Sequence, residues 1–256
     1  MDRRSLILGS VAGAFLLDHW PAFAQSAGPT PEGTITPPPS FADIAEQIVA
    51  GIPPTTDYVA IIETLAALKS PGAPRGPDGE PYCWRWKKYA NPLLVRMWRD
   101  MGYHGEVNDC DEWCAIAIGW CLKRSGRDVP SNVESSQAYL KSWGTPVDTP
   151  QLGDIVVFTD DSPKRAGHGH VTVFKSQVDQ NHLIGLGGNQ DLSMASNCPA
   201  GHPVSAIDER PMTMDTRKYD AQGKAVSGWH VNRYIRPPAP VRAPLQEPKK
   251  AGSAVL

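Results

Sequence analysis

Apolar residues recur at helical spacing along the first part of the chain. They occupy one face of residues 41–50 and one face of residues 58–68, which predicts two short helices. Asn91 followed by Pro92 is typical of a helix start, with the asparagine as the cap and the proline in the first turn. We expect this third helix to continue until Gly102 stops it.

A denser apolar run at residues 113–122 predicts a fourth helix. Asp109 or Asp111 can cap its start, and Gly126 follows its end. Because this helix is apolar on nearly every face, we expect it to be largely buried. Residues 136–143 predict a short fifth helix.

The pattern changes after residue 152 to short runs that alternate or are wholly apolar, as strands do. The predicted strands cover residues 155–158, 170–178, 182–186 and 229–235. Helices followed by strands predict an α+β fold, in which the helices pack on one side of a mostly antiparallel sheet.

The first 24 residues have the composition of an export signal, with Arg3 and Arg4, an apolar run at 6–17 and a small-x-small cleavage site at 22–24. The apolar run is shorter than the roughly 20 residues that span a membrane, so we expect no stable span after removal of the signal. Paired arginines suit the twin-arginine route, although any basic start suits the general secretory route. The mature protein is therefore expected in the periplasm or outside the cell.

Composition divides the rest of the chain. Residues 25–40 are rich in Pro, Gly, Ser and Thr and are predicted to be a flexible linker. Residues 41–80 form a helical segment, residues 81–236 form the main domain, and residues 237–256 are predicted to be a disordered tail.

The net charge bears on nucleic-acid binding, and the number of cysteines limits the possible disulfides. A net charge of -2 gives no basic surface for nucleic acid, so we expect no nucleic-acid partner. Five cysteines are an odd number, so in an oxidising compartment at least one stays free or pairs between chains. If Cys114 is the free one, up to two bridges remain among Cys83, Cys110, Cys121 and Cys198, and their connectivity stays open, as does the oligomeric state.

Cys114 lies at the start of the predicted fourth helix. If Asp111 is the cap, Cys114 is the third helical residue, where unpaired N–H groups and the helix dipole stabilise a thiolate. The alternative is a buried structural cysteine or one half of a disulfide. Cys121 lies two turns further along and is predicted to belong to the core or to a bridge.

A thiol nucleophile needs a base, and two histidines are candidates. His170 opens a predicted strand directly after the glycine-containing loop 166–169, and His168 lies within that loop. The residue pattern does not choose between them. The two histidines could chelate a metal, but they lack further ligands, so we expect no metal and no cofactor.

Strand register supplies a third residue. A two-residue hairpin loop at 179–180 pairs His170 with Asn189, whose amide can hold the imidazole ring. A three-residue loop makes Gln190 the partner instead. With the first register, His170 takes the thiol proton and returns it to a leaving amine while Asn189 orients the ring, which is the chemistry of acyl transfer to water. Backbone N–H groups at the helix start can stabilise the oxyanion.

Four segments in this order carry a resemblance to a known family: 113–115 (Trp-Cys-Ala), 153–158 (Gly-Asp-Ile-Val-Val-Phe), 169–171 (Gly-His-Val) and 186–190 (Leu-Gly-Gly-Asn-Gln). They resemble the CHAP and NlpC/P60 superfamily of cysteine peptidases, most of all its bacterial and phage branch. The resemblance covers roughly residues 85–236. It implies a papain-like α+β core and cleavage of amide or peptide bonds in bacterial peptidoglycan.

The resemblance also implies roles for individual residues. Cys114 matches the nucleophile, His170 rather than His168 matches the base, and Asn189 matches the orienting residue. Candidate substrate-binding residues are Trp113, His168 and Gln190. The long segment 195–228 has no counterpart and is expected to reshape the substrate groove. The alternatives are a catalytically silent wall-binding protein of the same fold and a secreted antibacterial effector.

Overall fold

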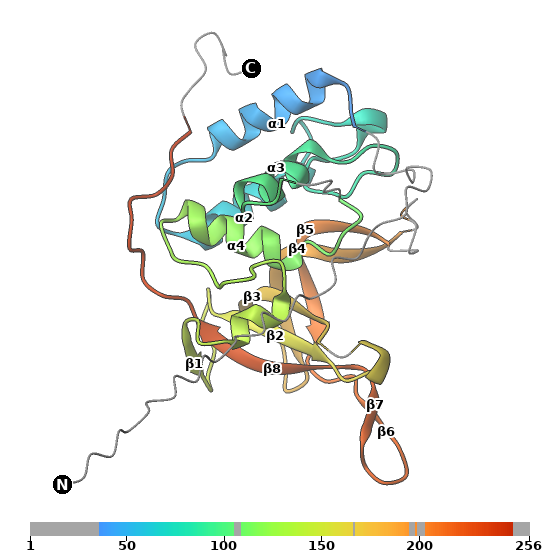
Figure 1. Cartoon of the computed structure of the whole chain (residues 1–256). Helices are drawn as coiled ribbons and strands as arrows, with labels where there is room; N and C mark the ends of the chain where they lie inside the picture. The colour runs from blue at the N-terminus through green and yellow to red at the C-terminus, as the bar shows by residue number, and fades with distance from the viewer. Residues whose placement is uncertain (1–35, 105–108, 166, 195–197, 199–202, 248–256) are drawn as a thin grey trace, which may run out of the picture. The chain divides into compact units, whose positions relative to one another are not determined.

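Helices come first along the chain and strands follow (Figure 1). The structure is a computed structural model and describes residues 36–104, 109–165, 167–194, 198 and 203–247. The predicted signal peptide and most of the predicted linker lie outside the described residues.

The described residues form four α-helices, eight strands and several 3-10 helices. The α-helices are α1 (Pro39–Gly51), α2 (Tyr58–Ala66), α3 (Pro92–Asp100) and α4 (Cys114–Arg124). The 3-10 helices are η1 (Ala67–Lys69), η2 (Pro77–Gly79), η3 (Ser136–Leu140) and η4 (Pro163–Arg165). The strands are β1 (Thr145–Val147), β2 (Ile155–Asp160), β3 (Gly169–Gln177), β4 (His182–Met194), β5 (Val204–Thr213), β6 (Lys218–Tyr219), β7 (Ala225–Ser227) and β8 (Trp229–Arg236).

Six strands form one antiparallel sheet in the order β1-β8-β2-β3-β4-β5, and β6 and β7 form a separate two-stranded sheet. Figure 1 shows the four helices gathered on one side of the strands. The predicted α+β class and the antiparallel sheet are therefore confirmed.

Two hydrophobic clusters cover the two faces of the sheet. Ile155 and Val157 of β2 point into the main cluster, which also contains residues of all four helices. Val156 and Phe158 point into a smaller cluster on the opposite face. Successive side chains of a strand point to opposite faces, so both faces of β2 are buried. Because α1 and α2 contribute to the main cluster, the predicted helical segment 41–80 shares its core with the main domain.

Local signals in the sequence set the boundaries of α3 but not those of α4. The side chain of Asn91 accepts the N–H of Leu93 at 2.9 Å, and Gly102 after the helix has a φ of +98°, as predicted. Trp113 is the N-cap residue of α4 and makes no side-chain cap bond. The prediction of an aspartate cap is therefore wrong: the Asp109 carboxylate accepts two N–H groups elsewhere, from Trp86 and Asn91.

The strand prediction was incomplete. The predicted strands appear as β2, β3, β4 and β8, whereas β1 and β5 were not predicted. The predicted fifth helix is only the 3-10 helix η3. Strand β5 forms the edge of the large sheet and lies inside the segment 195–228 that had no assigned structure.

The first part of the C-terminal tail is ordered, contrary to prediction. The N–H of Val241 donates to the carbonyl oxygen of Gly126 at 2.9 Å, and the N–H of Leu245 donates to that of Arg124 at 2.8 Å. The carboxylate of Glu247 lies 3.1 Å from the Arg124 guanidinium. Residues 237–247 therefore run along the C-terminal end of α4, and residues 248–256 lie outside the described part of the chain.

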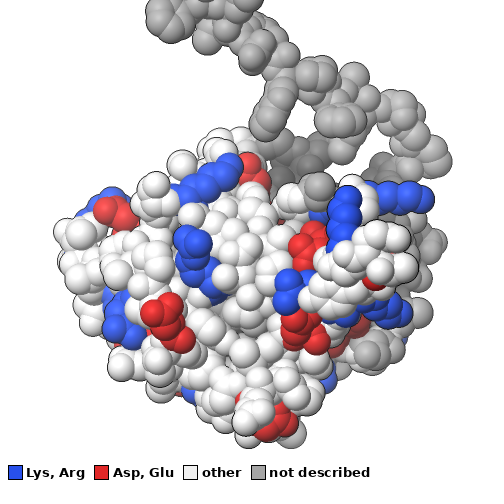
Figure 2. All heavy atoms as spheres, turned by 90° about the horizontal axis from the view of Figure 1, so that it is seen from below, with Lys and Arg blue, Asp and Glu red and all other residues white. Residues whose placement is uncertain are grey.

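Figure 2 shows one face of the molecule, seen from below the view of Figure 1. Uncharged side chains cover its centre, and acidic and basic groups lie side by side around it, so this face carries no field of a single sign. Within the described ranges, none of the helices has the length and apolar composition needed to cross a membrane.

Candidate active site

Cys114 is the first residue of α4, not the third as predicted, because the helix is capped by the backbone of Trp113. Its side chain is only 4% exposed, but it lines a cleft of about 1270 Å³. Backbone N–H groups of Val171 and Ala115 act to lower the pKa of its thiol. The first of these belongs to β3, so the start of α4 lies directly against that strand.

The cleft brings most of the predicted site residues together. It is lined by Cys114, His168, His170, Asn189 and Gln190, and also by residues that sequence reasoning did not select. The unselected residues include six charged ones and a serine, namely Arg85, Glu112, Glu134, Arg165, Asp191, Arg210 and Ser205.

His170 stands on β3 next to Val171. It is paired with Phe158 of β2, and its Nε2 atom is buried with no hydrogen-bond partner in the structure. The side chain of Gln190 donates from its Nε2 atom to the hydroxyl of Thr172 at 3.0 Å. Gln190 also raises the pKa of His170, against the larger effect of burial, so it is a candidate for the role that the sequence assigns to Asn189.

Burial dominates the protonation of the reacting pair. It raises the pKa of the Cys114 thiol to about 12, although the N–H groups of Val171 and Ala115 act in the opposite direction. Burial also lowers the pKa of His170 to about 4. Both shifts favour the uncharged forms of the thiol and the imidazole at pH 7. The backbone N–H groups act on the thiol in the direction expected of a helix start, but burial outweighs them.

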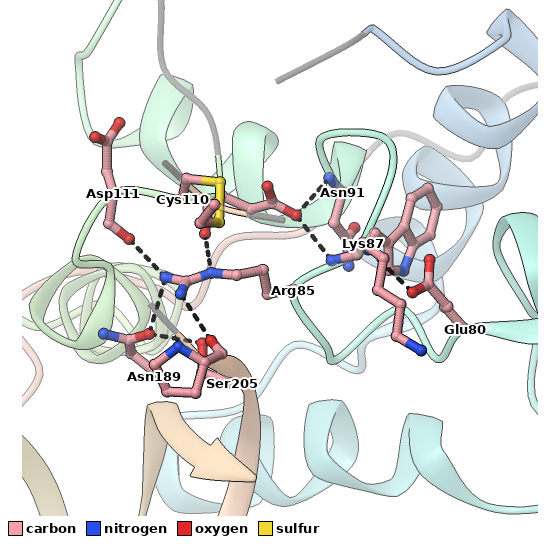
Figure 3. The surroundings of a disulfide bond; sticks show 12 residues. Glu80, Arg85, Lys87, Asn91, Cys110, Asp111, Asn189 and Ser205 are labelled. Atoms are coloured by element: carbon pink, nitrogen blue, oxygen red, sulfur yellow. Dashed lines mark hydrogen bonds between the residues drawn. A yellow bond between two sulfur atoms is a disulfide. The ribbon is translucent and has the colours of Figure 1, made fainter. Parts of the chain in front are cut away.

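The side chain of Asn189 hydrogen-bonds three other side chains, none of which is the predicted partner His170. The Asn189 Oδ1 atom accepts hydrogen bonds from the guanidinium of Arg85 at 3.2 Å and the hydroxyl of Ser205 at 2.7 Å (Figure 3). Its Nδ2 atom donates to the carboxylate of Glu112. Asn189 is therefore part of a polar network on the wall of the cleft rather than a partner of the imidazole.

A β-bulge explains this difference. Along β4, Gly187 pairs with Asp208 of β5 and Gln190 pairs with Ala206, so three steps on one strand match two on the other. Asn189 has a φ of +55° within this bulge. The extra residue turns the Asn189 side chain out of the position that regular alternation predicts, and Gln190 takes that position.

Next to this bulge, β3 pairs with β4 in the predicted register, but the turn alone does not produce that register. Val173 pairs with Leu186, as a two-residue loop would give. Nearer the turn, however, Gln177 pairs with Leu183, which corresponds to a longer loop. An irregularity between Phe174 and Ser176 shifts the pairing by one residue and so restores the predicted register. Two bulges, rather than the turn alone, therefore decide which side chains reach the cleft.

Glycines allow α4 and β4 to come into contact. A Cβ atom at Gly188 would lie 2.4 Å from the Cβ of Ala117 and 2.7 Å from the ring of Trp113. Only glycine leaves room for the helix start at this point. Trp113 is itself only 1% exposed, so the structure places it in the core and not on the wall of the cleft, contrary to its candidate role in substrate binding.

A second close approach explains the glycine before the base. A Cβ atom at Gly169 would lie 2.1 Å from the carbonyl oxygen of Phe158 and 2.1 Å from the Nε2 atom of Gln137. Gln137 donates a hydrogen bond to that same carbonyl at 3.0 Å. The glycine therefore lets η3 close over the beginning of β3, next to His170.

One disulfide ties the loop before α4 to the segment between β4 and β5. Cys110 bonds Cys198 with a Cα–Cα distance of 5.5 Å (Figure 3). Cys83, Cys114 and Cys121 are free and buried. The free state of Cys114 and the pairing of Cys110 with Cys198 were both among the alternatives that the sequence left open.

Arg85, Glu112 and Ser205 are the site residues that sequence reasoning missed. Nothing local marks Arg85, because its partners are backbone carbonyls far away in the sequence. Ser205 lies in the segment 195–228, to which the sequence pattern assigned no structure. Comparison with known proteins adds no assignment, because no family model, curated protein or solved structure matches the chain.

Proposed function

We propose that this protein is an exported cysteine hydrolase that cleaves amide or peptide bonds in bacterial peptidoglycan, with a papain-like core of the NlpC/P60 type. One observation carries the proposal: Cys114 at the start of α4 and His170 on β3 line the same cleft. A nucleophile at a helix start beside a histidine on a neighbouring strand is the arrangement that acyl transfer requires.

The uncharged forms of the thiol and the imidazole indicate how the reaction begins. When a substrate carbonyl reaches the sulfur, the thiol proton moves to His170 as the sulfur–carbon bond forms. The tetrahedral intermediate collapses by breaking the carbon–nitrogen bond, and His170 gives the proton to the leaving amine. Water then attacks the thioester and gives a proton to His170, the carbon–sulfur bond breaks, and His170 returns the proton to the Cys114 sulfur. Backbone N–H groups in the first turn of α4 are expected to stabilise the oxyanion.

The walls of the cleft suit a substrate that carries both charges. Glu112 and Glu134 supply negative charge, and Arg165 and Arg210 supply positive charge. Peptide stems of peptidoglycan carry both carboxylates and amino groups, so both walls can contribute to binding. His168 lines the same cleft and remains a candidate for substrate binding, while Gln190 acts on the imidazole.

An oxidising compartment is part of the proposal. Disulfides persist in secreted and periplasmic proteins and are rare in the cytosol, so the Cys110–Cys198 bond supports export of the chain. This agrees with the export signal proposed from residues 1–24. The preference of Cys114 and His170 for their uncharged forms is the observation that favours the alternative, a catalytically silent protein that binds the cell wall.

Purified sacculi test the proposal directly. The mature protein is expected to release soluble muropeptides, and mass spectrometry of the fragments identifies the bond that is cut. Cys114→Ala is expected to lower the rate of release at least about 10³-fold, because the nucleophile is lost. Cys83→Ala is the matched control, since Cys83 is another free and buried cysteine that does not line the cleft.

Two results would contradict the proposal in different ways. Equal release by wild type and Cys114→Ala would exclude Cys114 as the nucleophile. Binding of the wild type to sacculi without any released product would favour the silent wall-binding protein.

A further inference from the structure

A chain of hydrogen bonds leads from the core to a carboxylate beside the reacting pair. Glu112 lies two residues before Cys114 and lines the same cleft. Its carboxylate accepts a hydrogen bond from the Nδ2 atom of Asn189. The Oδ1 atom of Asn189 in turn accepts from Arg85 and from Ser205. The four side chains come from the segment before α3, the loop before α4, and strands β4 and β5.

The core end of this chain is rigidly held. Arg85 is only 1% exposed, and its guanidinium donates to the backbone carbonyl oxygens of Asp109, of Pro203 at 2.9 Å and of Asp111 at 3.1 Å (Figure 3). An arginine has donors only. Arg85 therefore presents an N–H to Asn189, and this requires the amide oxygen of Asn189 to face the core.

The orientation of the Asn189 side-chain amide decides whether it presents a donor or an acceptor to Glu112. Because the oxygen of Asn189 is taken by Arg85 and Ser205, its NH₂ group points in the opposite direction, toward Glu112. An NH₂ group can only donate, so it selects an acceptor at this position. The bulge at Asn189 thus holds a carboxylate beside the nucleophile instead of holding the imidazole.

Glu112 differs from the other charged groups in the cleft in acting on both reacting residues. Burial lowers the pKa of His170, and the charge of Glu112 opposes that effect. Burial raises the pKa of Cys114, and Glu112 raises it further. The charged or titratable side chains that also line the cleft are His168, Glu134, Arg165, Asp191 and Arg210.

We propose that Glu112 is a positioning residue of this site, held by the Arg85–Ser205–Asn189 chain, whose carboxylate favours the protonated form of His170 during proton transfer. The inference rests on the proposed function only in taking Cys114 and His170 as the reacting pair. It assigns a role to Asn189 that is different from orienting the imidazole.

Alkylation of Cys114 in the full mature protein tests this role without any substrate. The thiolate displaces iodide from iodoacetamide and forms a thioether, so the alkylation rate against pH reports the fraction of thiolate. Fragment-ion mass spectrometry separates Cys114 from Cys121 and Cys83. Glu112→Gln removes a negative charge that disfavours the thiolate. The alkylation midpoint is therefore expected to move to lower pH by about 0.5 to 1 unit.

Three comparisons separate an effect of charge from an effect of structure. Glu134→Gln removes another carboxylate of the cleft, which is hydrogen-bonded by Tyr103, and is expected to leave the midpoint unchanged. Glu112→Asp keeps the charge and is expected to restore a midpoint close to that of the wild type. Asn189→Ala releases the carboxylate and is expected to move the midpoint part of the way toward that of Glu112→Gln.

Ionic strength gives a further check, because the carboxylate is exposed to solvent. In about 1 M salt the difference between wild type and Glu112→Gln is expected to shrink by at least about half. An unchanged or higher midpoint in Glu112→Gln, or an equal shift in Glu134→Gln, would overturn the role of Glu112.

These outcomes are independent of the proposed hydrolase activity. If the wild type releases nothing from sacculi while Glu112→Gln still shifts the alkylation midpoint, the hydrolase proposal fails and the electrostatic role stands. If release depends on Cys114 while the midpoint does not move, the opposite holds.

Discussion

The two ends of α4 carry cysteines that are almost equally buried and chemically very different. Cys114 is 4% exposed and Cys121 is 1% exposed, and burial raises the pKa of both thiols. Only Cys114 lines the cleft, beside His170 and the N–H of Val171. Two almost equally buried thiols of one helix therefore differ in their surroundings, because only Cys114 borders a cleft that a histidine also lines.

The surroundings that hold the two ends also differ. The loop before α4 is held by the Cys110–Cys198 disulfide and by the guanidinium of Arg85. The last turn of α4 is held by the C-terminal segment through Val241, Leu245 and Glu247. A covalent bond and a buried hydrogen-bond network therefore secure the end that borders the cleft, while backbone contacts and an ion pair secure the other end.

The largest expected difference in activity is between a variant of His170, the proposed base, and a variant of Cys121, in the second half of α4. His170→Ala removes the proton acceptor and is expected to lower release from sacculi at least about 10³-fold. Cys121→Ala is expected to keep activity within about twofold and to lower the free energy of unfolding by about 1 to 2 kcal/mol, because it leaves a small cavity. Sacculus release and urea denaturation measure the two effects. If Cys121→Ala lost activity while its fold stayed intact, the proposal that only Cys114 takes part in the reaction would be wrong.

A smaller loss of activity is expected from a change at Gln190, near the start of α4. Gln190→Leu removes the polar group that acts on the imidazole and is expected to lower kcat about 10- to 100-fold. Because Gln190 raises the pKa of His170, its loss lowers that pKa, and the limb of the pH–rate profile that reports His170 moves to lower pH. Asn189→Ala does not touch the ring and is expected to lower kcat less. A larger loss in Asn189→Ala than in Gln190→Leu would restore the orienting role that the sequence assigns to Asn189.

Two further variants change stability and compare how firmly the two ends of α4 are held. Cys198→Ser opens a covalent link between residues 88 positions apart and is expected to lower the free energy of unfolding by about 2 to 4 kcal/mol. Glu247→Ala removes an ion partner of Arg124 and is expected to lower it by about 1 kcal/mol. Chemical denaturation of both variants at one pH checks the order, and a reversed order would mean that the tail holds α4 more firmly than the disulfide does.

Much of the fold follows from periodicity in the sequence. The predicted helices at 41–50 and 58–68 appear as α1 and α2, and the cap at Asn91 fixes the start of α3. The apolar run at 155–158 appears as β2, and the alternation from 170 appears as β3. These features depend on residues within one or two turns of each other, which is why local pattern suffices to predict them.

Features that depend on distant partners were missed or wrongly predicted. The ordered segment 237–247 looks disordered in composition, because its hydrogen bonds are made to carbonyls of α4 far away in the sequence. Arg85 carries no motif for the same reason, and the start of α4 is set by backbone geometry at Trp113 rather than by an aspartate side chain.

Local pattern was enough to predict a cysteine at a helix start and a histidine at a strand start, and the structure places both on the lining of one cleft. Local pattern was not enough to predict the partners of the polar side chains around them, because these depend on strand irregularities. A bulge inserts one residue into β4, and one residue exchanges the two faces of a strand. Gln190 therefore acts on His170, and Asn189 is left to hold Glu112.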